Sequence, residues 1–161
     1  MDMVTDMVTS SFVVDTQAPL LDAAGVEAAR LRHVARAALV TENRSVTYAM
    51  LATARNTSEP AARQWVKRLR DNGRLITVDH GNYTLIPSYQ FDRDYEVIPA
   101  VSSTTQVLAG AGMGGWAIWR WFCVVSPWID DKPINLLAPN THHPEALEEL
   151  AVQFVKDSRE G

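Results

Sequence analysis

The segment from Ser58 to Gly73 has the clearest structural pattern in the sequence and limits what the chain can fold into. Ser58 is a residue type that caps helix starts, Pro60 is tolerated in a first helical turn, and Gly73 suits the left-handed conformation that often ends a helix. Between these ends the apolar residues recur at helical spacing, at Ala62, Trp65, Val66 and Leu69. We therefore expect a helix across this segment.

Two further helices are expected before Ser58. Residues 26–40 carry apolar side chains at helical spacing with arginines on the other faces. Residues 47–55 are expected to form a two-turn helix that Thr47 caps, followed by a turn at residues 56–57. The residues of the shorter helix that should face inward are Met50 and Leu51.

Two runs rich in β-branched residues follow Gly73. Residues 74–79 and 82–86 flank His80 and Gly81, which predicts a β-hairpin. Helix, helix, turn, helix and hairpin, in this order, are typical of a winged helix-turn-helix. The predicted fold class is therefore mainly α, with a winged helix-turn-helix N-terminal domain followed by a small helical C-terminal domain.

The expected domain organisation has four parts. Residues 1–22 show no sustained period and are expected to form a flexible tail. Residues 23–87 form the winged helix-turn-helix domain, 88–98 a linker whose aromatic side chains dock onto one or both domains, and 99–161 a helical domain for dimerisation or partner binding. The helices expected in this last domain span residues 99–110, 114–125, 133–138 and 144–158.

The charge of the chain is unevenly distributed. The net charge is -4, but residues 23–74 hold ten Arg or Lys against four Asp or Glu, whereas residues 88–161 hold five against ten. Positive potential concentrated in one segment of an acidic protein is what a phosphate-binding surface needs. We therefore expect the first half to bind a polyanion.

The outward face of the predicted 58–73 helix has the residue types of a DNA-contacting surface. Gln64 and Lys67 point directly away from the predicted apolar face. Arginine and lysine neutralise phosphates or contact guanine, and glutamine pairs bidentately with adenine. An ordinary solvated helix face is the alternative, but the preceding short helix and the following hairpin favour DNA binding. The candidate DNA-binding residues are Thr57, Ser58, Arg63, Gln64, Lys67, Arg68, Arg70, Arg74, His80 and Asn82.

Four of the five tryptophans lie between Trp116 and Trp128. On a helical projection, one apolar face holds Ile118, Trp121, Phe122 and Val125, and a second face holds Trp116, Trp119, Arg120 and Cys123. One small domain buries only one face fully, so the second face has the composition of an interface hot spot. A core helix covered on both sides is the alternative. The candidate partner-binding residues are Trp116, Trp119, Arg120 and Trp128.

These motifs carry a family resemblance. The C-terminal part of the chain resembles the C-terminal domain of antitoxins of the Xre/MbcA/ParS family. The resemblance is carried by residues 115–122, by the Ser-Pro-Trp-Ile run at 126–129, by residues 132–137 and by a final helix near Glu145. The resemblance covers about 65 residues from Tyr95 onward, with Asp131 where the family usually has glycine. The helix-turn-helix part of actinobacterial proteins with this arrangement is similar to residues 45–52, 63–66 and 85–90.

The resemblance implies DNA binding by the first domain, and dimerisation and capture of a RES-type NAD-degrading toxin by the second. We therefore expect a sequence-specific transcriptional regulator, an antitoxin-like repressor of its own operon, that binds double-stranded DNA as a homodimer. Two alternatives stay open. One is a toxin-neutralising interaction protein with little DNA binding, and the other is a phage or prophage repressor built from the same domains.

Other functional classes lack their motifs in this sequence. Residues 110–115 satisfy Gly-x-Gly-x-x-Gly, but the 46 residues after them are too few for the parallel sheet of a dinucleotide site. Cys123, His142 and His143 lack metal-site spacing, and no catalytic serine motif or carboxylate pair is present, so we expect no enzyme, metal or cofactor. A non-basic N-terminus, short apolar runs and one cysteine indicate a cytoplasmic protein without a membrane partner.

Overall fold

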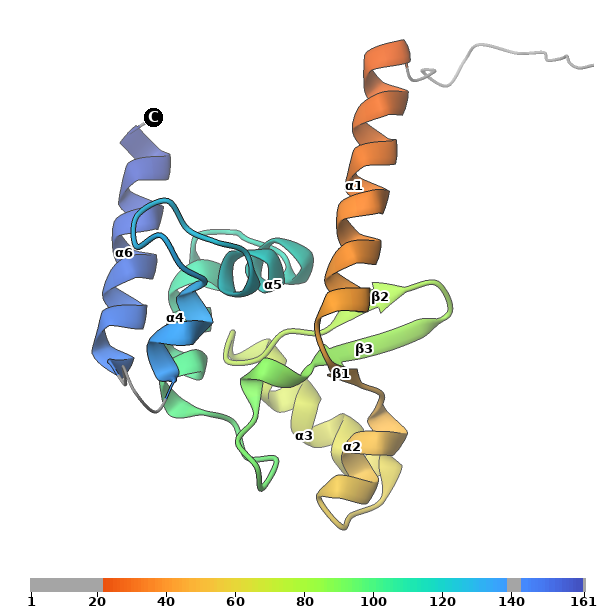
Figure 1. The fold of residues 1–161 in the computed structure, drawn as a ribbon. Helices are drawn as coiled ribbons and strands as arrows, with labels where there is room; N and C mark the ends of the chain where they lie inside the picture. Colours follow the sequence, from red (N-terminus) through yellow and green to blue (C-terminus); the bar gives the residue numbers. More distant parts are fainter. Residues whose placement is uncertain (1–21, 139–142, 161) are drawn as a thin grey trace, which may run out of the picture. The chain divides into compact units, whose positions relative to one another are not determined.

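The computed structural model describes residues 22–138 and 143–160. These residues are mainly helical and include a small three-stranded sheet (Figure 1). The elements, in chain order, are α1 (Ala23–Glu42), β1 (Ser45–Val46), α2 (Tyr48–Ala54), α3 (Glu59–Asp71), β2 (Val78–His80), β3 (Tyr83–Pro87), the 3-10 helix η1 (Ser88–Gln90), α4 (Pro99–Gly110), α5 (Gly115–Cys123), the 3-10 helix η2 (Pro133–Leu137) and α6 (Pro144–Glu160).

All seven helices predicted from the sequence are present, with ends that differ by a few residues. The predicted helix at 133–138 is the 3-10 helix η2, and the predicted helix at 114–125 ends at Cys123. The tail predicted at residues 1–22 lies outside the described residues except for Asp22. None of the helices in the described ranges combines the length and the apolarity needed to cross a bilayer.

Local capping explains why α2 and α3 begin where they do. The Thr47 hydroxyl accepts a hydrogen bond from the Met50 amide, and the Ser58 hydroxyl accepts one from the Ala61 amide. Each satisfies an amide that has no partner inside its helix. The chain leaves α3 through Gly73, whose φ of 70° is the left-handed conformation expected there.

The sheet has the strand order β1-β3-β2, with both neighbouring pairs antiparallel. The predicted hairpin is confirmed, but its turn is shifted. His80 pairs with Tyr83, so Gly81 and Asn82 form the two-residue turn, and Gly81 has a φ of 60°. The first strand of the hairpin, β2, starts at Val78 and not at Arg74. Strand β1 was not predicted, because two residues are too few to show a periodic pattern.

Two clusters of buried side chains hold the described residues together. The smaller core joins α2, α3 and the sheet, and its most deeply buried members are Leu51, Ala62, Val66, Leu75 and Ile86. The larger core joins the hairpin to the C-terminal helices, and its most deeply buried members are Val101, Leu108, Ile118, Trp119, Phe122, Leu147 and Ala151. Met50 was expected to face inward but is 53% exposed, because α2 turns only Leu51 and Ala52 toward the smaller core.

The chain divides into two compact units, and the boundary between them lies within α1, after Ala37. The part from Ala38 onward forms one unit that contains both cores. A domain boundary at residues 88–98 stays a prediction, but side chains from both sides of this segment share the larger core, Val78 from one side and Val101 and Phe122 from the other.

Gly115 has a packing role at the start of α5. A Cβ atom at this position would collide with the carbonyl oxygen of Thr77 and crowd Val78. Only a glycine therefore lets α5 approach the strand that precedes the hairpin turn. The glycine-rich run that resembles a dinucleotide-binding motif thus includes a residue needed for close helix packing.

Gln90 connects the segment after α3 to the end of β3 through its side-chain amide. The side chain is fully buried. Its Oε1 accepts from the Ile76 amide at 2.8 Å, and its Nε2 donates to the carbonyls of Ile76 at 3.0 Å and Pro87 at 3.1 Å. These bonds pair the backbone at Ile76, which has no ladder partner because β2 begins only at Val78. The segment between α3 and β2 is thereby fixed to the end of β3.

Replacing Gln90 by leucine should destabilise the fold strongly. The substitution leaves an amide and two carbonyls of the buried backbone without a partner, and each such group costs about 1–3 kcal/mol. We expect urea unfolding to show a loss of about 3–5 kcal/mol in the free energy of unfolding. The control is Gln153→Leu on the exposed face of α6, which should change it by less than about 0.5 kcal/mol. Equal small effects of the two variants would contradict this role of Gln90.

Candidate nucleic-acid interface

The two helices α2 and α3 pack against each other across a tight turn (Figure 1). Asn56, with a φ of 56°, reverses the chain after α2, and the Thr57 amide donates to the Ala52 carbonyl at 2.9 Å. Leu51 from α2 and Ala62 and Val66 from α3 are fully buried between them. The apolar face predicted for the 58–73 helix therefore faces the smaller core, with Trp65 and Leu69 at its half-buried edges.

The opposite face of α3 is solvent-exposed, as the sequence predicted. It contains no apolar side chain larger than alanine among its outward positions, and its exposed polar residues are Arg63, Gln64, Lys67, Arg68 and Arg70. Arg74 follows α3 and is also exposed. The structure thus presents one amide and several cations on the side of the helix that faces away from the protein.

Some of these cations are engaged by carboxylates of the same helix. Lys67 pairs with Asp71 at 2.6 Å and Arg63 pairs with Glu59 at 2.8 Å. The Lys67 ammonium, by donating to Asp71, lowers the pKa of that carboxyl below its usual value. Such exposed pairs are weak and exchange readily for a phosphate partner. Their carboxylates nevertheless reduce the positive potential that the sequence had indicated for this face.

Arg68, Arg70 and Arg74 make no ion pair within the described residues. The Arg70 guanidinium donates to the Thr77 hydroxyl at 3.3 Å, which turns it toward the chain that leads to the hairpin. Arg68 and Arg74 are exposed. Phosphate binding by this face would therefore depend most on the last turn of α3 and the residues just after it.

The start of α3 is less open to a phosphate than the sequence suggested. The Thr57 amide is already bonded to Ala52, and the Ser58 hydroxyl is engaged in capping. Pro60 has no amide to donate. The side chains of Thr57 and Ser58 are exposed at this end, and the Ser58 hydroxyl, which accepts the capping bond, keeps its own proton to donate.

Asn82, in the turn of the hairpin, is exposed, whereas His80, just before the turn, is only partly exposed. His80 is half-buried, with its ring at the edge of Trp116 and 6.0 Å from it between centroids. Its placement at the predicted turn was wrong, because the turn is one residue further on. Tyr83 beside the turn is 67% exposed and was not among the predicted residues. Alternation along β3 could not have identified it, because Leu85 and Pro87 share its face of the strand but are half-buried and buried.

Arg55 fixes the far end of the α2–α3 pair, a role that the sequence did not reveal. Its guanidinium lies 3.6 Å from the centre of the Trp65 ring, and it donates to the Tyr95 carbonyl at 2.7 Å and to the Glu96 carboxylate at 3.1 Å. Trp65 stacks on Phe91, which in turn lies against Tyr95. The aromatic residues of the 88–98 segment pack as predicted, since Tyr89 contacts Phe122 on the other side.

The tryptophan-rich helix is buried on a different face from the one predicted. Ile118, Trp119, Phe122 and Cys123 are buried, whereas Trp121 and Trp116 are half-buried and Arg120, Val125 and Trp128 are exposed. The assignment of Trp119 to an exposed partner-binding face was therefore wrong. Helix α5 ends at Cys123, so Val125 is not part of its apolar face, and the buried side is centred between the two projected faces.

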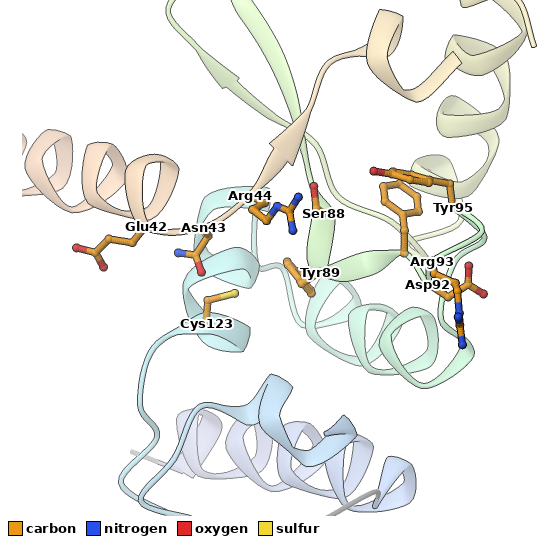
Figure 2. Close-up of a pocket in the computed structure, with 10 residues that line it drawn as sticks. Glu42, Asn43, Arg44, Ser88, Tyr89, Asp92, Arg93, Tyr95 and Cys123 are labelled. Atoms are coloured by element: carbon orange, nitrogen blue, oxygen red, sulfur yellow. The ribbon is translucent and has the colours of Figure 1, made fainter. Parts of the chain in front are cut away.

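A hollow of about 580 Å³ lies beside the end of α1 and the 88–95 segment (Figure 2). Glu42 and Asp92 face it together with Arg44 and Arg93, so its charges balance and favour no ligand of one sign. Figure 2 shows the Cys123 sulfur on the side toward Tyr89. Burial raises the pKa of the Tyr89 phenol well above its usual value and that of the Cys123 thiol to about 11.

No family model and no curated protein matches the chain. Among solved structures, the fold is similar to the NMR structure of Rv2175c, with a TM-score of 0.58 and 15% sequence identity. The match covers 70% of this chain and 82% of that chain. A likeness at this identity concerns the arrangement of the backbone, and it agrees with the mainly helical fold and small sheet described above.

Cys123 should be nearly inert to alkylation while the protein is folded. With a pKa of about 11, only about a thousandth of the thiol is ionised at pH 8, and the thiolate is the reactive form. We expect iodoacetamide to react at least 100-fold more slowly than with the chain unfolded in guanidinium. Raising the pH toward 11 should speed the reaction, because deprotonation then becomes extensive. A folded-state rate equal to the unfolded one at pH 8 would contradict the burial of this thiol.

Proposed function

We propose that this chain is a sequence-specific DNA-binding transcriptional regulator, in which α2, α3 and the β2–β3 hairpin act as a winged helix-turn-helix. The observation that carries the proposal is that α3 has one buried apolar face and one exposed face of polar and cationic side chains. One side is fully buried at Ala62 and Val66, and the other exposes an amide and several cations. A helix that is anchored rigidly and presents such a face suits insertion into a major groove.

The residues divide into two roles under this proposal. Gln64 is exposed in the first half of α3, where recognition helices contact base edges, and its amide suits bidentate pairing with adenine. Arg68 lies in the last turn of α3 and Arg74 follows the helix, and both neutralise phosphates. Lys67 and Arg63 join them when a phosphate replaces the carboxylate partners Asp71 and Glu59.

The hairpin is the wing in this proposal. Asn82 at its turn and Tyr83 beside it are exposed, and both side chains can donate to a phosphate oxygen. Asp79 is also exposed and carries the wrong charge for this purpose. The wing therefore contributes fewer contacts than α3.

The resemblance to the Xre/MbcA/ParS antitoxins supports a more specific role, repression of the chain's own operon in the cytoplasm. The second candidate function, neutralisation of a RES-type toxin with little DNA binding, is favoured by the exposed apolar side chains near Trp128. The same experiment separates the two, because only a regulator binds duplex DNA through α3.

Gel-shift titrations of the full chain on promoter fragments test the proposal. Arg68→Ala and Arg74→Ala should each weaken binding on all sequences and lower the dependence of log K on log salt by about 0.9 for each phosphate that is no longer neutralised. The control is Arg159→Ala, an exposed arginine at the end of α6, which should change neither quantity. If the wild-type chain does not shift duplex DNA at low salt, the proposal fails.

Gln64→Ala should act on selectivity and not on general affinity. If Gln64 pairs with adenine, its loss removes discrimination of roughly 1–3 kcal/mol at one base pair, while binding to non-specific DNA is unchanged. Selection from a randomised site measures this directly for the wild type and the variant. Retention of the full preference at every position would exclude Gln64 from base recognition.

A further inference from the structure

A groove of about 410 Å³ lies between α5, the turn that follows this helix, and α6. Its walls are mostly apolar, and the largest side chains in them are Met113, Trp121, Trp128 and Phe154. Sites for small molecules are concave, have volumes of about 300–1,000 Å³ and are lined mainly by apolar and aromatic side chains with a few polar groups. This hollow, which we call the Trp128 groove, has the size and the lining of such a site.

The walls of the Trp128 groove are held in place by contacts within the protein. In the turn after α5, the Ser126 amide donates to the Asp131 carbonyl and the Asp130 amide donates to the Ser126 carbonyl, both at 2.8 Å. The Trp121 ring packs edge-on against Phe154, with 6.3 Å between the ring centroids. A site that is formed before the ligand arrives loses little entropy on binding, which favours affinity for a small molecule.

Arg120 gives the groove its charge. It is the only charged side chain among the described residues that line the groove, and it is exposed. It forms no ion pair within residues 22–138 and 143–160, and no carboxylate of these residues lines the groove beside it. The rest of this half of the chain is acidic, since residues 88–161 hold ten Asp or Glu against five Lys or Arg. A lone cation at an apolar groove is complementary to an anion that has an apolar body.

Ser126 adds a second hydrogen-bond donor to the lining. Its hydroxyl accepts from the Trp128 amide at 3.3 Å, which leaves the hydroxyl proton free to donate. The Arg120 guanidinium likewise only donates. The polar groups of the groove therefore suit a ligand whose head group only accepts hydrogen bonds, as an ionised carboxylate does.

The extent of the groove favours a small molecule over a protein. The large apolar side chains exposed beside it are Val124, Val125 and Trp128, which are 40%, 54% and 51% exposed. A specific protein interface takes about 20–30 residues from each side. The walls of the Trp128 groove come from far fewer residues than that.

We propose that the Trp128 groove binds a small amphipathic carboxylic acid. The hydrocarbon body of the ligand lies against Trp121, Trp128 and Phe154, and its carboxylate pairs with Arg120. The proposal goes beyond DNA binding and does not depend on it. It gives the chain a small-molecule ligand of a defined chemical class in addition to a macromolecular partner.

Calorimetric titration of the full chain with three probes of equal chain length tests the ligand class. The probes are decanoate, decanol and decylamine, each kept below the concentration at which it forms micelles. Decanoate should bind about 5-fold or more tightly than decanol, because only decanoate pairs with Arg120, and decylamine should bind most weakly. A groove that is merely apolar would favour decanol, whose head group is less strongly hydrated than a carboxylate. Decanol binding as tightly as decanoate, or no binding of decanoate, overturns the proposal.

Variants separate the head-group contact from the apolar contact. Arg120→Gln should weaken decanoate binding about 5-fold and leave decanol binding unchanged, so that the preference disappears. Trp128→Ala should weaken both probes on the order of 10-fold, because each loses the same apolar contact. The matched control is Arg159→Gln at the end of α6, which should change neither affinity. An unchanged preference in Arg120→Gln would overturn the assignment of the carboxylate to Arg120.

The indole N–H signals of the five tryptophans show where decanoate binds. In a ¹⁵N-labelled full chain, the signals of Trp121 and Trp128 should shift during the titration, whereas that of Trp65 in the smaller core should not. Sedimentation of the same samples shows whether another chain occupies the groove instead. An oligomer that Trp128→Ala dissociates and that excludes decanoate, or shifts confined to the other tryptophans, would overturn the proposal.

Discussion

The buried amide of Gln90 is the interaction on which the arrangement of this protein depends. The chain between α3 and β2 passes through the interior without a strand to pair with, and Gln90 supplies both a donor and an acceptor to Ile76 there. Because the same amide also bonds Pro87, it connects the exit of α3 to the end of β3. A buried polar network that is fully satisfied specifies one arrangement and excludes its neighbours. The path of the chain after α3 is therefore fixed by a residue that lies well beyond the end of this helix in the sequence.

The second constraint is the aromatic stack that begins at Arg55. Its guanidinium covers Trp65 and bonds the Tyr95 carbonyl, so the end of α2, the middle of α3 and the segment before α4 are held at one point. Gln90 thus fixes the chain that follows α3, and Arg55 contacts the middle of the helix at Trp65. A helix that reads bases needs such fixed support, since small displacements misalign bidentate bonds.

Local chemistry decided which parts of the fold were predictable. The ends of α3 could be predicted from Ser58 and Gly73, and its buried face could be predicted from the regular helical spacing of its apolar residues. Helix α5 was different, because almost every one of its side chains is apolar and the projection offered two faces of similar character. Which face is buried depends on α4, η2 and the hairpin packed around it, and Gly115 admits that contact by the absence of a side chain.

The same distinction applies to the candidate site. The outward residues of α3 could be named from spacing alone, but their pairing with Glu59 and Asp71 depends on rotamers, and the shift of His80 out of the turn depends on a one-residue register. Gln90 and Arg55 gave no sequence signal, since an isolated polar residue at the end of a helix looks the same whether it is solvated or bonded within the protein. Prediction failed where a residue's role is defined by partners distant in the sequence.

The claim that α3 is presented for DNA binding is tested most directly by amide chemical shifts. A ¹⁵N-labelled full chain, titrated with a duplex oligonucleotide at low salt, should show its largest shifts at the outward positions of α3 and at the turn of the hairpin, and small shifts along α6. Shifts centred on α5 and α6, or no saturable shifts at all, would contradict the account.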